Sequence, residues 1–90
     1  MEEKQDIRIV VGQRGWVHVG VYAKDGATVK LTKAQCIRRW GTSRGLGQIA
    51  ADGPTSSTVL DVAGTIEVHE LALVHTLACD AAAWSKTLGL

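Results

Sequence analysis

The sequence contains no phenylalanine, one proline and no long apolar stretch. None of its apolar runs approaches the roughly 20 residues that a membrane-spanning helix needs. Residues 1–6 are polar and acidic, whereas a secretory signal peptide begins with basic residues and continues into an apolar stretch. These absences predict a protein that has no membrane partner and acts in the cytoplasm.

The shortage of aromatic residues restricts what the interior can contain. The core must be built from Val, Ile, Leu and Ala, with Trp16, Trp40 and Trp84 as its large side chains. A composition of 46% hydrophobic and 21% charged residues is typical of a folded chain, not a disordered one. We place a single β-rich domain at residues 7–90, after a flexible N-terminus at 1–6. A chain this short buries only about 60–65% of its unfolded surface, so self-association is expected to help stabilise it.

Cysteine is scarce as well, and charge is unevenly distributed. In a cytoplasmic protein, Cys36 and Cys79 are expected to be free, buried thiols and not a disulfide. Residues 4–44 contain nine of the ten Lys and Arg and two acidic residues, a charge of +7. Residues 45–85 contain five acidic residues and no Lys or Arg, a charge of −5. Two interpretations follow: a basic face that holds an anion, or two halves that pair and neutralise each other.

Alternation of apolar and polar residues predicts most of the chain to be strands. The clearest strand is 16–22, in which Val17, Val19 and Val21 share one face. Further strands are predicted at residues 7–11, 27–32, 34–40 after a kink near Lys33, 58–62 and 65–69. Turns are predicted where glycine occurs, at residues 12–15, at the hairpin sequence Lys24-Asp25-Gly26 and at Ala63-Gly64.

Two short helices accompany these strands. Residues 46–52 can form about one and a half helical turns. Residues 68–79 fit either a helix or two strands linked at Glu70-Leu71; we favour strands, followed by a helix over 80–88 with Asp80 as its N-cap. The predicted fold is mainly β: a small bent antiparallel sheet or a partly open SH3-like barrel, with a short helical insert and a short C-terminal helix.

The most unusual stretch combines three arginines, a tryptophan, two hydroxyls and three glycines directly before the first predicted helix. Arginine is a forked, permanent cation, and glycines let a ligand approach backbone N–H groups. A helix N-terminus adds unpaired N–H donors, and Trp40 can stack on a ring. The segment therefore predicts a site for a nucleotide-like anion made by Arg38, Arg39, Trp40, Thr42, Ser43, Arg44, Gly45 and Gly47.

Structural use of the same segment is the alternative. Its arginines can pair with the acidic second half, Trp40 can anchor a core or an interface, and its glycines can form the turn into the helix. The run from Gly45 to Ala50 matches G-x-G-x-x-A, but the predicted helix ends too soon for a dinucleotide-binding βαβ unit. No Gly-Lys-Ser/Thr follows, so the segment is not a P-loop.

Patterns typical of catalysis and metal binding are missing. The sequence has no Cys-x-x-Cys and no close pair of histidines. No spacing among Asp61, Glu67, Glu70 and Asp80 singles out an acid–base pair. Although Cys36 stands near two arginines, an inert buried thiol is the simpler interpretation. We expect no enzymatic activity, no metal and no cofactor.

The chain contains several distinctive motifs, each of which occurs once: IVVGQRGWV at 9–17, IRRWGT at 37–42, RGLGQ at 44–48, GPT at 53–55 and LDVAGT at 60–65, with Cys79-Asp80 and Trp84. In these motifs, over most of residues 7–84, the chain resembles a family of small uncharacterised proteins from tailed bacteriophages. That resemblance implies a phage protein that acts in the cytoplasm of the infected host bacterium or in the virion.

Three functions fit these observations. The first, which we favour, is a homo-oligomeric binding module that captures a nucleotide-like anion, such as a host immune signal, with the face of Trp16 and Tyr22 as the interface between copies. The second is a protein-interaction module, either an inhibitor of a host factor or a minor virion protein. The third is a single-stranded nucleic-acid binder with a groove formed by Trp16, Tyr22, Trp40, Arg14, Lys24 and Lys30.

Overall fold

The computed structural model of the protein describes residues 6–90 and confirms a mainly β fold. The elements are β1 (Ile7–Gly12), η1 (Gln13–Gly15), β2 (Val17–Asp25), β3 (Thr28–Arg39), α1 (Leu46–Asp52), β4 (Val59–His69), η2 (Glu70–Ala72), β5 (Leu73–Ala78) and α2 (Ala81–Leu88). The flexible N-terminus expected at 1–6 lies outside the described residues except for Asp6, whose carbonyl accepts a hydrogen bond from the Tyr22 amide at 2.7 Å. None of the helices within residues 6–90 is long and apolar enough to cross a membrane.

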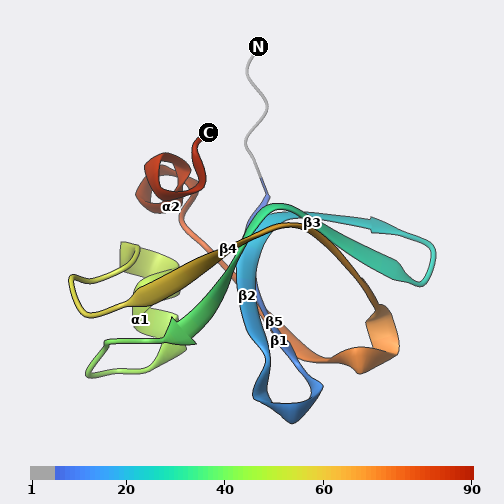
Figure 1. Cartoon of the computed structure of the whole chain (residues 1–90), viewed down its shortest axis with the longest axis horizontal. Helices are drawn as coiled ribbons and strands as arrows, with labels where there is room; N and C mark the ends of the chain where they lie inside the picture. Colours follow the sequence, from blue (N-terminus) through green and yellow to red (C-terminus); the bar gives the residue numbers. More distant parts are fainter. Residues whose placement is uncertain (1–5) are drawn as a thin grey trace.

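The strands form one antiparallel sheet in the order β4-β3-β2-β1-β5. The sheet is strongly bent, and η2 joins its two edge strands across the open side (Figure 1). Over residues 6–90, β4 and β5 are not hydrogen-bonded to each other in the sheet. The architecture is therefore a curled sheet that closes part of the way round, as a partly open barrel does.

The bend is concentrated where β3 changes its register. Lys33 has a φ of 51°, and the pairing with β2 shifts between Val19 and Val21. Gly20 lies at this shift, where an added Cβ would be 3.0 Å from the Thr32 oxygen. The kink predicted near Lys33 is confirmed, and Gly20 is what allows β2 to approach it.

The turn predicted at Ala63-Gly64 is wrong. β4 continues without interruption from Val59 to His69, with Gly64 at a φ of 76° opposite Ala34. Gly64 thus lies beside the bulge in β3, and its positive φ lets β4 follow the bend without reversing direction. Two predicted short strands are one long edge strand.

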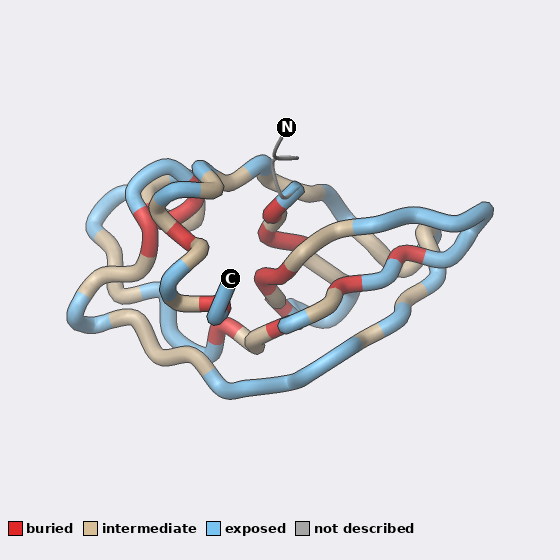
Figure 2. The backbone as a smooth tube through the Cα atoms, turned by 90° about the horizontal axis from the view of Figure 1, so that it is seen from above, coloured by how far each residue is buried: buried red, intermediate tan, exposed pale blue. Residues whose placement is uncertain are grey.

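Both helices pack on one face of the sheet, on the left in Figure 1. Ile9, Val19 and Ile37 point from the strands toward Ile49 of α1 and Trp84 of α2, and all five are buried. Figure 2 shows the buried residues grouped in the interior and the rim exposed. The alternation predicted for residues 16–22 is confirmed, because Val17, Val19 and Val21 all pack in this core.

Only one of the three tryptophans belongs to the core, which corrects the sequence prediction. Trp84 is fully buried, whereas Trp16 is 62% exposed and Trp40 is 43% exposed. The reason is topological: Trp16 precedes β2 at a turn and Trp40 follows β3 at the start of a loop, both beyond the reach of the helices that cover the sheet.

The other face of the sheet forms a smaller second core inside the curl. Val10, Leu31 and Ala34 are buried there, with Ile66 of β4 and Leu73 of β5 packed against them. Residues near the two edges of the sheet thus meet across its concave side. This is the packing that maintains the curl.

The C-terminal third is strand and then helix, as favoured from the sequence. η2 occupies the predicted link at Glu70-Leu71, and α2 begins directly after Asp80. Asp80 is the N-cap residue, as predicted, but it caps the helix through its backbone. Its carbonyl accepts a hydrogen bond from the Ala83 amide at 3.0 Å, and its side chain makes no capping bond.

Candidate functional site

The predicted anion-binding residues lie at the end of β3 and in the loop that leads to α1. They do not form a single pocket. Arg38 and Arg39 border a shallow hollow of about 300 Å³ beside Val59, whereas Arg44 and Gly47 border a separate one of about 400 Å³. The predicted binding residues, although close together in the sequence, are therefore divided between two surfaces.

Polar groups of this loop are largely used within the loop. The Thr42 hydroxyl donates to the Gly45 carbonyl at 3.0 Å. The amide of Arg44 donates to Oε1 of Gln48 at 3.0 Å, and the Ser43 hydroxyl donates to the same oxygen at 3.5 Å. Gln48 thus satisfies the Ser43 hydroxyl, which the sequence interpretation had assigned to a ligand, together with the neighbouring Arg44 amide.

A second set of contacts closes the loop at its base. The hydroxyls of Thr55 and Thr58 donate to the carbonyls of Gly41 and Trp40, each at 2.7 Å, and lie 3.1 Å from each other. Gly41 has a φ of 66° and packs directly on the backbone of Ser57. We call these contacts of Thr55 and Thr58 with Trp40 and Gly41 the clasp, and they explain why glycine is required at position 41. In the sequence, the only indication of the clasp was the run Thr55-Ser56-Ser57-Thr58 after a Gly-Pro pair.

The basic and acidic halves of the chain do pair in part. Nε of Arg38 lies 2.9 Å from Asp61, and Lys24 contacts Glu70. Arg44 is 3.7 Å from Asp52. Among the described residues Arg39 makes no ion pair. Charge neutralisation, one of the two interpretations of the charge pattern, thus accounts for two of the three arginines.

The predicted nucleic-acid groove is also partly occupied. The guanidinium of Arg8 covers the ring of Tyr22, 4.0 Å from its centre, and Lys24 is held by Glu70. Within residues 6–90, no group of three or more His, Cys, Asp or Glu side chains is placed to hold a metal ion.

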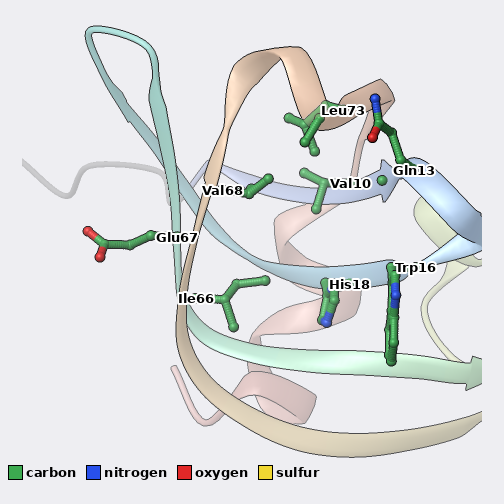
Figure 3. Close-up of a pocket in the computed structure, with 10 residues that line it drawn as sticks. Val10, Gln13, Trp16, His18, Ile66, Glu67, Val68 and Leu73 are labelled. Carbon is green, nitrogen blue, oxygen red and sulfur yellow. The ribbon is translucent and has the colours of Figure 1, made fainter.

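Sequence reasoning missed a cavity on the concave face of the sheet. Its volume is about 290 Å³, and its lining is mostly apolar. Figure 3 shows Val10 and Leu73 on one side, Ile66 and Val68 on another, and Trp16 beside His18 at the far wall. Glu67 belongs to the rim and points away from the others.

The wall of the cavity contains two stacked aromatic rings. The centres of the Trp16 and His18 rings are 6.2 Å apart, and the ring planes differ by 14°. Burial lowers the pKa of His18 from its usual value, so the imidazole is uncharged at neutral pH. Trp16 is largely exposed. The pair is a flat, uncharged surface open to solvent on one side.

A polar row continues from His18 across the same face. His18 is paired with Cys36, and Cys36 with Asp61. Arg38 lies at a register shift between Ile37 and Arg39, and its ion pair with Asp61 places its side chain on the same face, at the end where Trp16 precedes β2. Burial and the charge of Asp61 raise the pKa of Cys36, which keeps this thiol protonated.

The Arg38–Asp61 pair leaves part of the guanidinium available. Asp61 accepts from Nε, and the Arg38 side chain is 68% exposed. Its two terminal nitrogens carry four further N–H donors in a planar fork suited to phosphate or carboxylate. Of the predicted residues, Arg38 is the one that lies on the same face as the cavity.

The strict alternation of residues 16–22 was the available signal for this site, because it places Trp16, His18 and Tyr22 on one face. The sequence could not indicate that Ile66 and Leu73 complete the cavity, since both are distant in the chain. The chain matches no protein-family model, and no curated protein is significantly similar to it.

Proposed function

We propose that this protein is a non-catalytic binding module for a small anionic ligand that carries a flat ring, of the nucleotide type. The ring enters the cavity beside Trp16 and His18, and the anionic group meets the terminal nitrogens of Arg38. The observation that carries the proposal is the stacked Trp16–His18 pair, which forms an open wall of a mostly apolar cavity.

The size and chemistry of the cavity support a ring as the buried part of the ligand. At about 290 Å³ it is at the lower limit of the ~300 Å³ usual for small-molecule pockets, enough for a heterocycle but not for a whole nucleotide. Stacking of a base on an aromatic side chain contributes roughly 1–3 kcal/mol. The neutral imidazole of His18 adds one donor or acceptor that can select among ring edges.

The rest of the ligand must then lie outside the cavity, along the row that ends at Arg38. Arg38 provides a forked cation there, and its partner Asp61 fixes the direction of the guanidinium. This arrangement transfers the anion contact predicted for the loop to one arginine and replaces Trp40 by Trp16 as the stacking residue.

The likeness to tailed-phage proteins suggests the biological setting. A small protein that captures a nucleotide-like signal without changing it would remove that signal from a host immune pathway. We accordingly infer that it acts in the cytoplasm of the infected bacterium, as a homo-oligomer.

A thermal-shift screen against linear, cyclic and NAD-derived nucleotides tests the proposal. A ligand at 100 times its Kd stabilises the protein by about 2.7 kcal/mol, a melting shift of roughly 10 °C for a domain of this size. We expect one class of nucleotide to give such a shift. No shift with any nucleotide at millimolar concentration would overturn the proposal.

Two matched pairs of variants locate the site. Trp16→Ala and Trp40→Ala each remove an exposed indole, and Arg38→Ala and Arg44→Ala each remove an ion-paired arginine. The cavity site predicts that the shift is lost in Trp16→Ala and Arg38→Ala and kept in the other two. The reverse pattern would assign binding to the loop.

A further inference from the structure

Near its end, β3 contains one residue more than the part of β4 that pairs with it. Ile37 is paired with Leu60. Arg39, two residues further along β3, is paired with Val59, which is only one residue away on β4. Arg38 is therefore the extra residue of a β-bulge, a feature that redirects side chains and is common next to active sites.

The bulge changes where two consecutive arginines lie. In a regular strand the side chains of neighbouring residues lie on opposite faces of the sheet. Arg38 and Arg39 instead border the same hollow, which has a volume of about 300 Å³ and is completed by Val59. The irregular pairing thus brings two guanidinium groups to one place on the surface.

The hollow has an excess of positive charge. Nε of Arg38 lies 2.9 Å from a carboxylate oxygen of Asp61, which balances one of the two arginines. Arg39 makes no ion pair within the part of the chain that the structure describes. Because like charges so close together repel each other, an anion bound between them would lower the free energy of the pair.

The number of free donors favours one class of anion. Asp61 accepts from Nε of Arg38 and leaves the four N–H groups of its two terminal nitrogens, and Arg39 adds the five N–H groups of a second guanidinium. A carboxylate has two oxygens and is satisfied by a single arginine fork, whereas a phosphate group presents three oxygens that two forks can share. The donors at the hollow exceed what a carboxylate can use and suit a phosphate.

We propose that Arg38 and Arg39 together form a phosphate-binding site, and that the anionic group of the ligand is a terminal phosphate. The link to a ring rests on the proposed function, whereas the phosphate contact needs no stacking residue. Arg38 joins the two parts of the site, because it borders the hollow and its ion pair with Asp61 places it on the face of the cavity. Arg39 is then the residue that selects phosphate over carboxylate.

NMR titration of the full chain with pyrophosphate, which has phosphate groups but no ring, tests this site by itself. We expect the backbone amide signals of residues 37–40 and Val59 to move with a Kd in about the millimolar range, since exposed charges bind weakly. Acetate at the same ionic strength should bind at least about threefold more weakly, because it cannot engage both arginine forks. Trp16→Ala should leave the Kd for pyrophosphate unchanged.

Three arginine variants locate the contact. Arg39→Ala removes one fork, and Arg44→Ala is the matched control, since Arg44 is also exposed but borders a different hollow and lies 3.7 Å from Asp52. Arg39→Ala should weaken pyrophosphate binding at least about threefold, and Arg44→Ala should change it by less than about 1.5-fold. Arg39→Lys keeps the charge but loses the fork, so its Kd should lie between those of Arg39→Ala and the wild type.

The outcomes separate this site from the proposed function. No movement with pyrophosphate, equal binding of acetate, or loss of binding in Arg44→Ala but not in Arg39→Ala would overturn the phosphate site. A nucleotide that requires Trp16 but binds equally well to Arg39→Ala would also overturn it and would leave the cavity as the binding site. If pyrophosphate binds as expected and no nucleotide binds more tightly than pyrophosphate, the phosphate site stands and the proposed function fails.

Discussion

The indole nitrogen of Trp84 donates a hydrogen bond of 2.8 Å to the carbonyl oxygen of Ile49. Both residues are fully buried, one on α2 and the other on α1. The same carbonyl also accepts from the Gly53 amide at 2.8 Å, at the end of α1. One oxygen thus fastens the C-terminal helix to the helical insert, on the face of the sheet opposite the cavity.

Replacing Trp84 by phenylalanine removes this bond and part of the buried ring. Because Gly53 still satisfies the Ile49 carbonyl, the loss is one hydrogen bond, about 1 kcal/mol, plus about 1–2 kcal/mol for the missing ring atoms. Urea unfolding should show a total decrease of about 2–3 kcal/mol. Trp40→Phe, at an exposed indole, should stay within about 0.5 kcal/mol of the wild type, and an equal decrease in both variants would contradict the anchoring role.

Gly41 and Gly47 belong to the same glycine-rich segment but should respond oppositely to alanine. At Gly41 a Cβ would lie 2.3 Å from the Ser57 backbone, and the φ of 66° is unfavourable for any side chain. At Gly47, inside α1, no atom beyond the neighbouring residues and the backbone of the helix itself lies within 4 Å of the added Cβ. We expect Gly41→Ala to lower the melting temperature by roughly 10 °C or more, since a backbone clash adds to left-handed strain.

Gly47→Ala is the matched control and should stabilise the protein by up to about 1 kcal/mol, because alanine favours a helix interior over glycine. If Gly47→Ala abolished nucleotide binding while raising stability, the loop and not the cavity would be the site. If Gly41→Ala were tolerated, the clasp formed by Thr55 and Thr58 would not hold the loop as closely as its distances indicate.

The parts of the fold that sequence predicted well are governed by local chemistry. The helix at 46–52 was predicted with its observed bounds, because Gly53 and Pro54 stop it within the chain itself. The kink at Lys33 and the link at Glu70-Leu71 were also predicted correctly, because each is a local break in the alternation of apolar and polar residues. Ala63-Gly64 was mistaken for a turn because a glycine with positive φ serves equally in a turn and in a bulge, and only the neighbouring strand decides which.

The candidate site was predicted less well because it depends on contacts between distant residues. Arg38 was identified from its chemistry, and the alternation that puts Trp16 and His18 together was visible. The cavity, however, exists only once the sheet curls and brings Ile66 and Leu73 opposite them. Conversely, Gln48 accepts hydrogen bonds from the loop that had been assigned to a ligand. No rule of spacing distinguishes a donor that the protein satisfies from one that is left for an anion.

Asp61 offers a test that separates stability from binding. Its ion pair with Arg38 is half-exposed, and such pairs contribute at most about 1 kcal/mol, so Asp61→Asn should unfold at nearly the same urea concentration as the wild type. Removing its negative charge leaves Arg38 uncompensated, and the nucleotide identified by the thermal-shift screen should then bind about two- to tenfold more tightly. Calorimetric titration measures the change. Weaker binding in Asp61→Asn would mean that orienting Arg38 matters more than its net charge.

Cys79 makes the stability of the fold depend on alkaline pH. Burial raises the pKa of this thiol from 9.0 to about 11. In the unfolded chain the thiol ionises near pH 9, while in the folded protein it stays protonated, so the unfolded state gains charge first and stability falls as pH rises from about 9 to 11. Cys79→Ala removes that titration. The free energy of unfolding of wild type minus that of Cys79→Ala should therefore be constant from pH 7 to 8 and decline above pH 9.

Because the same protonation makes the thiol a poor nucleophile, a thiol-specific reagent at pH 8 should modify Cys79 slowly in the folded protein and fast in urea. Rapid modification of the folded wild type, absent in Cys79→Ala, would show that the thiol is accessible and ionised and that burial does not control it.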